Sequence, residues 1–174
     1  QLAQMLRTLA EMPKPTIARV HGAALGGGVG LVCACDIAVA SDTAFFATTE
    51  VRLGLIPATI GPYVLRAIGA RQAQRYFLTA ERISATRAQE IELVHEVVGA
   101  AALDSKIATI TASLLACGPR AQASAKRFVA DLSSRPIDAH LIAETAAAIA
   151  DIRATPEARE GLTAFLQKRK ATWT

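Results

Sequence analysis

The chain has 174 residues, of which 52% are hydrophobic and 20% are charged, so it can form one globular core and is neither disordered nor fibrous. Charged residues interrupt every apolar run before it reaches the roughly 20 residues that cross a bilayer, and the first residues lack the layout of a signal peptide. A soluble, cytoplasmic protein with no membrane partner is therefore expected. The formal charge of +4 is spread along the chain, so nucleic-acid binding, which needs a concentrated basic surface, is not expected.

The first part of the chain is predicted to be mixed α/β. Helical spacing over residues 2–12 is followed by a β-branched strand over 16–20, a glycine turn, and a helix that Asp36 closes. Two further strands are predicted at 37–40 and 44–47. Because only a short turn separates them, these two strands are expected to pair with each other.

Glycines and prolines then alternate with apolar residues over 51–69, which predicts tight turns and short helical pieces along one wall of a site. Helices are predicted at 71–78 and 84–90, the second with Ser84 as its N-cap, and a last short strand at 94–98.

Beyond Gly99 the sequence becomes rich in alanine and is predicted to be helical. A stripe of small and apolar residues on the third of these helices requires a partner surface, such as another helix or a second subunit. The expected helices cover 103–116, 121–132, 137–152 and 157–170, and the stripe consists of Ile137, Leu141, Thr145, Ala148 and Ile152.

The three cysteines do not suggest a metal site. Cys33, Cys35 and Cys117 are odd in number and have no partners at metal-ligand spacing. They are interpreted as small core residues, and no metal is predicted.

The strongest local motif is ALGGGVGLVCACD, which ends at Asp36. A glycine run at a strand-to-helix turn leaves backbone N–H groups unpaired at the positive end of the helix, with no side chain to block an approaching anion. Such donors could stabilise the oxyanion of a thioester enolate. Close packing of the strand on the helix explains the glycines equally well.

Glu50 is the second candidate, since it lies between the apolar stretch AFFATT and VRLGLIP. A partly buried carboxyl group there could exchange protons with a substrate. The alternative is an ordinary acidic residue at a helix N-terminus beside Arg52.

The basic residues Lys168, Arg169 and Lys170 follow an apolar helical segment. They form either a solvated helix end that the helix dipole favours or a site for a phosphate-bearing ligand.

Four linked blocks resemble the enoyl-CoA hydratase/isomerase (crotonase) family in order, spacing and residue type. They are KPTIARVHGAALGGGVGLVCACDIAVAS, FATTEVRLGLIP, RYFLTAERISATRAQEIELVHEVV and REGLTAFLQKRK. The segment EVRLGLIPATIGPYV differs from the commoner IPGAGGTQRL type of the family. It is most similar to bacterial methylglutaconyl-CoA and carboxygeranoyl-CoA hydratase-like members.

The resemblance implies an α/β fold, in which the C-terminal part of a crotonase-like spiral of ββα units covers 1–100. A helical trimerisation and CoA-contacting region would then cover 101–174. The family's N-terminal third, with one of the two oxyanion N–H donors, would lie upstream of residue 1. A homotrimer or hexamer is expected, with an acyl-CoA as substrate and no cofactor apart from the coenzyme A that the substrate carries.

The resemblance also assigns residues to the site. It places the other oxyanion N–H on Gly27 and the acid/base on Glu50. Gly30 falls where the best-known hydratases carry a second glutamate, so two-carboxylate hydration is in question. Contacts to the thioester, the acyl chain and the adenine and phosphate end of CoA fall on Leu25, Gly26, Pro57, Ala58, Phe165 and Lys168.

Three functions follow as hypotheses. The leading one is an enoyl-CoA hydratase, a lyase that works through an oxyanion-stabilised enolate. The second is a Δ3,Δ2-enoyl-CoA isomerase with Glu50 as its sole acid/base, which Gly30 favours. The third is a non-catalytic protein of the crotonase fold, because a fold does not guarantee activity.

Overall fold

The computed structural model describes residues 1–173 and divides the chain into two compact units, residues 1–110 and a unit that begins at Thr111. In the first unit, each successive pair of strands contributes one strand to each of two sheets. The sheets have the strand orders β1-β3-β6 and β2-β4-β5. The strands are β1 (Ile17–Val20), β2 (Ala23–Leu25), β3 (Ile37–Ser41), β4 (Phe45–Ala47), β5 (Ile83–Ser84) and β6 (Glu96–Val98).

Three of the four strand pairs in these sheets are parallel, and β4 pairs with β5 in the antiparallel direction. Ile17 of β1 lies opposite Ile37 of β3, and Ala23 of β2 lies opposite Phe45 of β4. A helix follows each of the first two strand pairs, namely α2 (Gly27–Ala34) and α3 (Gly61–Thr79). This is the spiral of ββα units that the family resemblance implies.

The prediction that the strands at 37–40 and 44–47 pair with each other is wrong. β3 pairs with β1 and β6, whereas β4 pairs with β2 and β5. The turn after β3, closed by the Ala44 N–H donating to the Ser41 carbonyl at 3.0 Å, carries the chain from one sheet to the other. β1 and β2, from the previous turn of the chain, already lie beside these two positions, so β3 pairs in parallel with β1 and β4 pairs in parallel with β2 instead of forming a hairpin.

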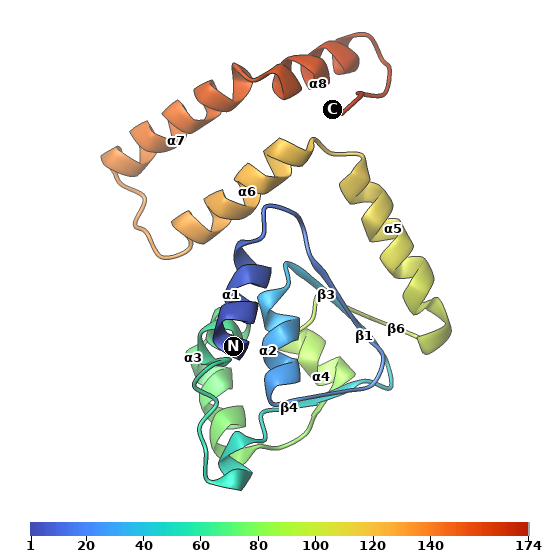
Figure 1. Cartoon of the computed structure of the whole chain (residues 1–174), viewed down its shortest axis with the longest axis vertical. Helices are drawn as coiled ribbons and strands as arrows, with labels where there is room; N and C mark the ends of the chain where they lie inside the picture. The colour runs from blue at the N-terminus through green and yellow to red at the C-terminus, as the bar shows by residue number, and fades with distance from the viewer. Residues whose placement is uncertain (174) are drawn as a thin grey trace. The chain divides into compact units, whose positions relative to one another are not determined.

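Three helices pack together beside the strands. α2 packs against both α1 (Leu2–Glu11) and α3, and Figure 1 shows the three helices side by side. Five of the eight residues of α2 are buried, namely Val29, Gly30, Val32, Cys33 and Ala34. The core between these elements includes Leu6, Val29, Phe46, Ile60 and Val64.

The helix that was predicted at 71–78 begins at Gly61, ten residues earlier. Pro62 occupies its first turn, where a missing N–H is tolerated, and Gly69 interrupts it with φ 70° and ψ 164°. The region 51–69 therefore contains a short 3-10 helix, η1 (Glu50–Leu53), an irregular loop and the first half of α3. The N-cap role of Ser84 is confirmed, because its side chain accepts a hydrogen bond from the Arg87 N–H in α4 (Ala85–Glu90).

Polar side chains fix the start of β3. The Asp36 carboxylate accepts hydrogen bonds from the Thr16 N–H at 2.7 Å and the Thr16 hydroxyl at 2.8 Å. The His95 Nδ1 atom accepts one from the Ala38 N–H at 3.0 Å. Asp36 thus joins the segments that enter β1 and β3, and His95 joins the segment before β6 to β3.

A short 3-10 helix, η2 (Ala100–Ala102), precedes α5 (Leu103–Leu115), which crosses the boundary between the two units. The second unit further contains α6 (Pro119–Leu132), α7 (Ala139–Arg153) and α8 (Pro156–Leu166). In this unit few apolar residues are buried, Leu141 and Ala164 being the examples, and many are exposed. The assignment of 1–100 and 101–174 to different roles stays a prediction.

Two of the predicted helices in this unit are shorter than expected. α7 begins at Ala139 with Asp138 as its N-cap, so Ile137 lies outside the helix and is 87% exposed. Of the predicted stripe, Leu141 is buried and Thr145, Ala148 and Ile152 are half-buried. α8 ends at Leu166, before the basic residues.

The interpretation of all three cysteines as core residues is also wrong. Cys33 is buried, but Cys35 is half-buried and Cys117 is exposed. Cys117 lies just after the end of α5. The apolar residues around it in the sequence resemble those of a buried segment, so its exposure could not be predicted from them.

No single helix within residues 1–173 has the length and apolar character needed to cross a membrane, although the segments Ala100–Leu115 and Pro119–Leu132 meet that test when they are counted together as a bent pair.

Candidate active site

The glycine turn before α2 has the conformation that its sequence requires. Gly26 has φ 48° and ψ −116°, a backbone conformation that side chains disfavour. Its N–H donates to the Ala47 carbonyl at 2.9 Å, which ties the turn to β4. Its carbonyl accepts from the Val29 N–H at 2.9 Å and from the Gly30 N–H at 3.4 Å. Gly26 therefore forms the N-cap of α2 and satisfies two of the helix's first donors.

The next two N–H groups of the turn, those of Gly27 and Gly28, are unpaired within the described residues. Neither donates a hydrogen bond to any of residues 1–173, and both residues are half-buried. The first N–H groups of a helix carry its positive dipole end, so an anion that approached this turn would find unpaired donors. This is the state that an oxyanion donor at Gly27 requires.

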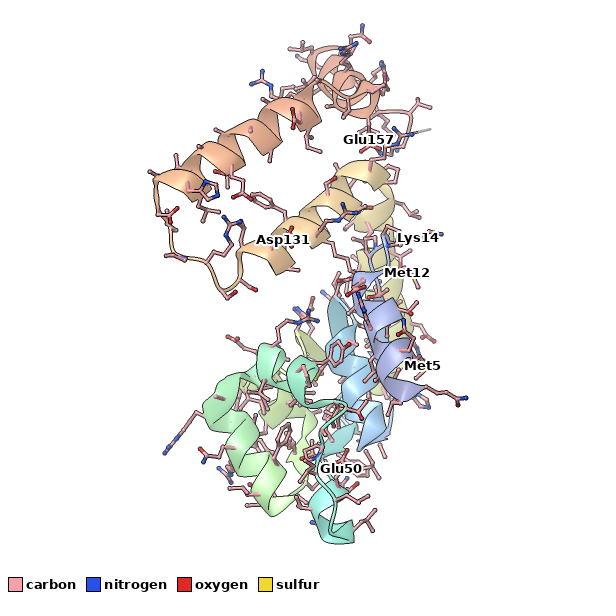
Figure 2. All side chains as sticks on the ribbon, turned by 60° about the vertical axis from the view of Figure 1, so that its left-hand side comes forward. Met5, Met12, Lys14, Glu50, Asp131 and Glu157 are labelled. Atoms are coloured by element: carbon pink, nitrogen blue, oxygen red, sulfur yellow. The ribbon has the colours of Figure 1, made fainter. Side chains whose placement is uncertain are left out.

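Glu50 begins η1 and lies beside this turn. A Cβ atom built on Gly26 would stand 3.4 Å from the Glu50 Oε1 atom. Figure 2 labels Glu50 in the first unit, near the start of α2. Its Oε2 atom is buried and has no hydrogen-bond partner in the described part of the chain. Buried polar atoms are almost always paired, so this oxygen is available to a ligand.

Arg52 does not neutralise Glu50. The Arg52 guanidinium instead donates to the Ala80 carbonyl at 2.7 Å, at the C-terminus of α3. The alternative interpretation, an acidic residue at a helix N-terminus beside Arg52, agrees with the position of Glu50 as the first residue of η1, although the Arg52 side chain binds elsewhere. The η1 helix is held in place by the Glu50 carbonyl, which accepts from the Leu55 N–H at 3.0 Å.

Other side chains fill the space beside Gly30, the residue that the family resemblance aligns with a second glutamate in other hydratases. A Cβ atom on Gly30 would overlap the Ile60 Cγ2 atom, would stand 2.9 Å from the Ile60 Cβ atom, and would lie 3.4 Å from the Leu6 Cδ1 atom. Ile60 is 1% exposed and Leu6 is 0% exposed. Close packing therefore requires glycine at position 30, a reason that the sequence alone did not reveal.

The residues assigned to substrate contacts in the first unit lie on both sides of Glu50 along the chain. Leu25 is exposed directly before Gly26, Ala58 is exposed, and Pro57 is buried. Sequence reasoning missed the apolar side chains of the loop that follows Glu50, although the run LGLIP could have indicated them. Leu53, Leu55 and Ile56 are 74%, 60% and 74% exposed.

The two residues assigned to CoA belong to the second unit. Phe165 is 79% exposed near the end of α8. Lys168 follows the helix with φ 52° and is exposed, and its side chain forms no ion pair with any residue of 1–173. Arg169, in contrast, is paired with Glu160 at 2.7 Å.

Cys33, the nucleophile nearest to the glycine turn in sequence, is not available for chemistry. Burial raises the pKa of its thiol to about 12, so almost no thiolate forms at neutral pH. Within residues 1–173 no group of three or more His, Cys, Asp or Glu side chains could hold a metal ion.

Comparison with known proteins identifies the class. The family model described as enoyl-CoA hydratase/isomerase matches residues 1–174, so the chain belongs to this family. It is 36% identical over 171 residues to the crotonyl-CoA hydratase of Syntrophomonas wolfei, covering 98% of this chain and 65% of that protein. It is 34% identical over 168 residues to the short-chain-enoyl-CoA hydratase of Clostridium acetobutylicum, and the match covers 96% of this chain and 64% of that protein.

The solved structures agree with the fold. An enoyl-CoA hydratase from Shewanella pealeana superposes with a TM-score of 0.94 at 44% identity, covering 99% of this chain and 64% of that one. The expected crotonase-like α/β fold is confirmed. The chain spans about two thirds of the length of these relatives.

Proposed function

We propose that this chain carries the acid/base and one oxyanion donor of an acyl-CoA hydratase. One observation supports this above the others: the Glu50 carboxyl has a buried, unpaired Oε2 atom, and it lies against the glycine turn where the Gly27 N–H is unpaired. The names of the relatives, crotonyl-CoA hydratase and short-chain-enoyl-CoA hydratase, support the same reaction class.

The chemistry needs these two groups at neighbouring positions. The Gly27 N–H would donate to the thioester oxygen as negative charge gathers there, which lowers the energy of the enolate. Water would form a bond from its oxygen to Cβ of the 2-enoyl thioester, and the π electrons would move into the enolate. The Glu50 carboxyl would give a proton to Cα and receive the proton that the water loses, so one water molecule is added overall.

The test replaces Glu50 in the full-length protein. Glu50→Gln keeps the shape of the side chain and removes its ability to exchange a proton, so we expect hydration to fall by at least about 100-fold. Binding of a CoA thioester should remain nearly unchanged. Glu11→Gln, on the exposed face of α1, is the matched control and should retain full turnover. Retained turnover in Glu50→Gln would remove this residue from the mechanism.

Double-bond isomerisation is the second candidate, and the packing at Gly30 favours it. A single carboxyl can take a proton from C2 of a 3-enoyl thioester and return it to C4, while the double bond moves to C2–C3. This reaction needs no second carboxylate, and position 30 has no space for one while Ile60 is present. Supplying 2-enoyl and 3-enoyl thioesters separately, and measuring which is consumed, distinguishes the two reactions.

For the substrate we propose a branched, carboxylated enoyl-CoA of the methylglutaconyl or carboxygeranoyl type. The sequence EVRLGLIPATIGPYV, which begins at Glu50, supports this choice because it resembles that of such hydratases. The exposed apolar side chains of Leu53, Leu55 and Ile56 offer a surface for a branched chain. A higher kcat/KM for 3-methylglutaconyl-CoA than for crotonyl-CoA would support the assignment, and the reverse order would contradict it.

We also propose a homotrimer or hexamer in which Phe165 and Lys168 contact CoA. Exposed apolar residues in the second unit support association, because a monomer would leave them in water. They include Leu115, Val129, Ile142, Ile149, Leu162 and Leu166. Phe165→Ala and Lys168→Ala should raise the Kd for a CoA thioester without changing the proton-transfer step, and sedimentation should give the oligomer size.

A further inference from the structure

The segment that carries Glu50 is attached to the C-terminal end of α3 on both sides of that residue. Two residues before Glu50, the buried Thr48 hydroxyl donates to the Tyr76 carbonyl at 2.8 Å. Two residues after it, the Arg52 guanidinium donates to the Ala80 carbonyl at 2.7 Å. Both acceptors lie in the last turn of α3 or directly after it. These two hydrogen bonds, the η1 clamp, therefore join the segment around Glu50 to one helix end.

The end of α3 provides suitable acceptors for both donors. The last carbonyl groups of a helix lack partners within the helix and carry the negative end of its dipole. A guanidinium is always charged, so its hydrogen bond to such a carbonyl is stronger than one between neutral groups. Ala80 is completely buried, and Thr48 is only 2% exposed. The acceptor of Arg52 and the donor of the other hydrogen bond are thus both enclosed by the core.

The Glu50 carboxyl has few other contacts that could fix its position. Its Oε2 atom has no hydrogen-bond partner among residues 1–173. Its Oε1 atom lies near Gly26, but the Gly26 N–H donates to the Ala47 carbonyl instead. The Glu50 carbonyl accepts from the Gly54 and Leu55 N–H groups, which belong to the same segment. The place of the carboxyl therefore depends on where the main chain of η1 is held.

We infer that Thr48 and Arg52 are positioning residues, which hold Glu50 beside the turn that presents the Gly27 N–H. This inference rests on the proposed function. Neither residue touches the reacting atoms; both act through the main chain on either side of Glu50. A displacement of about 1 Å can lower the rate of a reaction by about 100-fold. A loosened η1 should therefore slow proton transfer and leave the contacts to CoA unchanged.

Arg52→Met in the full-length protein tests the second half of the clamp. Methionine keeps an unbranched side chain and removes the donor. We expect kcat to fall by at least about tenfold, while the Kd for a CoA thioester changes by less than about twofold. Arg52→Lys retains a cationic donor and should recover most of the lost kcat. Wild-type kcat in Arg52→Met would overturn the inference, and so would a higher Kd with unchanged kcat, which would mean that Arg52 binds the substrate.

Thr48→Val tests the first half independently. Valine has nearly the shape of threonine but no hydroxyl, and the Tyr76 carbonyl keeps the Ala80 N–H as its other donor. We expect kcat to fall again with little change in Kd, and Thr48→Ser, which keeps the hydroxyl, to remain close to the wild type. Turnover is compared at a temperature at which thermal unfolding shows every variant to be folded. A lower unfolding temperature with unchanged kcat would show a purely structural hydroxyl and contradict the positioning role.

Arg75→Met is the matched control for the loss of an arginine near this helix end. Arg75 is exposed in the last turns of α3 and donates to Glu81 at 3.0 Å, not to η1. Its replacement should leave kcat unchanged. An equal loss of kcat in Arg75→Met and Arg52→Met would mean that any change at the end of α3 slows the reaction, and the specific role of Arg52 would be wrong.

The double variant Glu50→Gln/Arg52→Met shows whether Arg52 acts through Glu50. If it does, Arg52→Met should lower the residual turnover of Glu50→Gln by less than about twofold, because no carboxyl is left to be positioned. A merely structural role would give the same loss in both backgrounds. The full tenfold loss in the Glu50→Gln background would therefore contradict the inference.

This proposal and the proposed function fail in different ways. If the wild type converts no acyl-CoA thioester, or if Glu50→Gln converts it normally, the proposed function is wrong. If the wild type is active and depends on Glu50, but Arg52→Met and Thr48→Val retain the wild-type kcat, only the role of the η1 clamp is wrong.

Discussion

The carboxyl group of Glu50 lies against the main chain of Gly26, and the two residues restrict each other. A side chain on Gly26 would have its Cβ atom 3.4 Å from Glu50 Oε1 and 3.6 Å from the Thr49 hydroxyl oxygen. Gly26 also has a positive φ of 48°, so its conformation disfavours a side chain, and a Cβ atom there would be in van der Waals contact with the Glu50 carboxyl. The proposed acid/base is therefore in direct contact with the turn that presents the proposed oxyanion donor.

Gly26→Ala should damage both stability and turnover. We expect a loss of about 1–3 kcal/mol in the free energy of unfolding, because a residue other than glycine is strained at this backbone conformation. Turnover should fall further than stability explains, since relief of the backbone strain would move the turn that the Glu50 carboxyl contacts. Denaturant unfolding and steady-state kinetics measure the two effects.

Gly22→Ala is the control for this substitution. A Cβ atom on Gly22 would meet no atom within 4 Å, and the backbone there does not have a positive φ. The change should therefore alter stability by less than about 0.5 kcal/mol. If the two alanine variants behaved alike, the contact between Gly26 and Glu50 would have no role.

Much of the site could be predicted because its elements follow from short-range patterns. The glycine run at the start of α2 and the isolated acid at Glu50 are visible within a few residues of sequence. The partner of Gly30 could not be predicted, because Ile60 is thirty residues away and its contact depends on how α3 packs on α2. The partners of β3 and β4 were mispredicted for the same reason, since a short turn indicates a hairpin unless neighbouring strands already occupy both positions.

The start of α3 could not be predicted for a different reason. Gly61, Pro62 and Gly69 each resemble loop residues when they are taken singly. In the structure Pro62 lies in the first turn of the helix, where it is favoured, and Gly69 marks an interruption within it. Local composition therefore predicted tight turns and short helical pieces in a region where burial of Val64 and Ile68 stabilises the first half of a long helix.

Asp36→Ala should destabilise the first unit by about 1–3 kcal/mol, because it leaves the Thr16 N–H and hydroxyl without their acceptor at the point where β1 and β3 begin. Asp104→Ala is the control, since it removes an acid whose partner, Arg19, is also exposed. An exposed pair of this kind contributes little. Thermal unfolding of both variants measures the difference, and equal losses would contradict the importance of the Asp36 contacts.

Glu157 has a structural role that its sequence context did not suggest. Its carboxylate accepts hydrogen bonds from the Arg120 N–H at 3.0 Å and the Ala121 N–H at 2.8 Å, so a residue of α8 caps the N-terminus of α6. Glu157→Ala should lower stability by about 1 kcal/mol, as the loss of other N-terminal caps does. Asp131→Ala, an exposed acid near the other end of α6 that Figure 2 also labels, should have a smaller effect. A larger effect at Asp131 would exclude the capping role.

Glu160 should make the end of the chain sensitive to acid. The hydrogen bond from Arg169, with a second from the Thr172 N–H, lowers the pKa of the Glu160 carboxyl from 4.5 to about 2. A group whose pKa is lower in the folded state contributes stability above its unfolded value and loses it as the pH falls through the folded value. The contribution of ionised Glu160 to stability should therefore be constant around neutral pH and should disappear as the pH falls from about 4.5 to about 2.

Glu160→Gln tests this directly, with hydrogen exchange at the Thr172 amide as a local readout, because that N–H donates to Glu160 Oε1 at 2.8 Å. At pH 7 the amide hydrogen of Thr172 should exchange faster in the variant than in the wild type. As the pH falls through the range between the two pKa values, the wild type should lose its advantage and the two proteins should converge. Because Glu160 and Arg169 are partly exposed, the difference should also shrink in high salt. A difference that widened towards low pH would mean that protonated Glu160, not its carboxylate, holds Arg169 and Thr172.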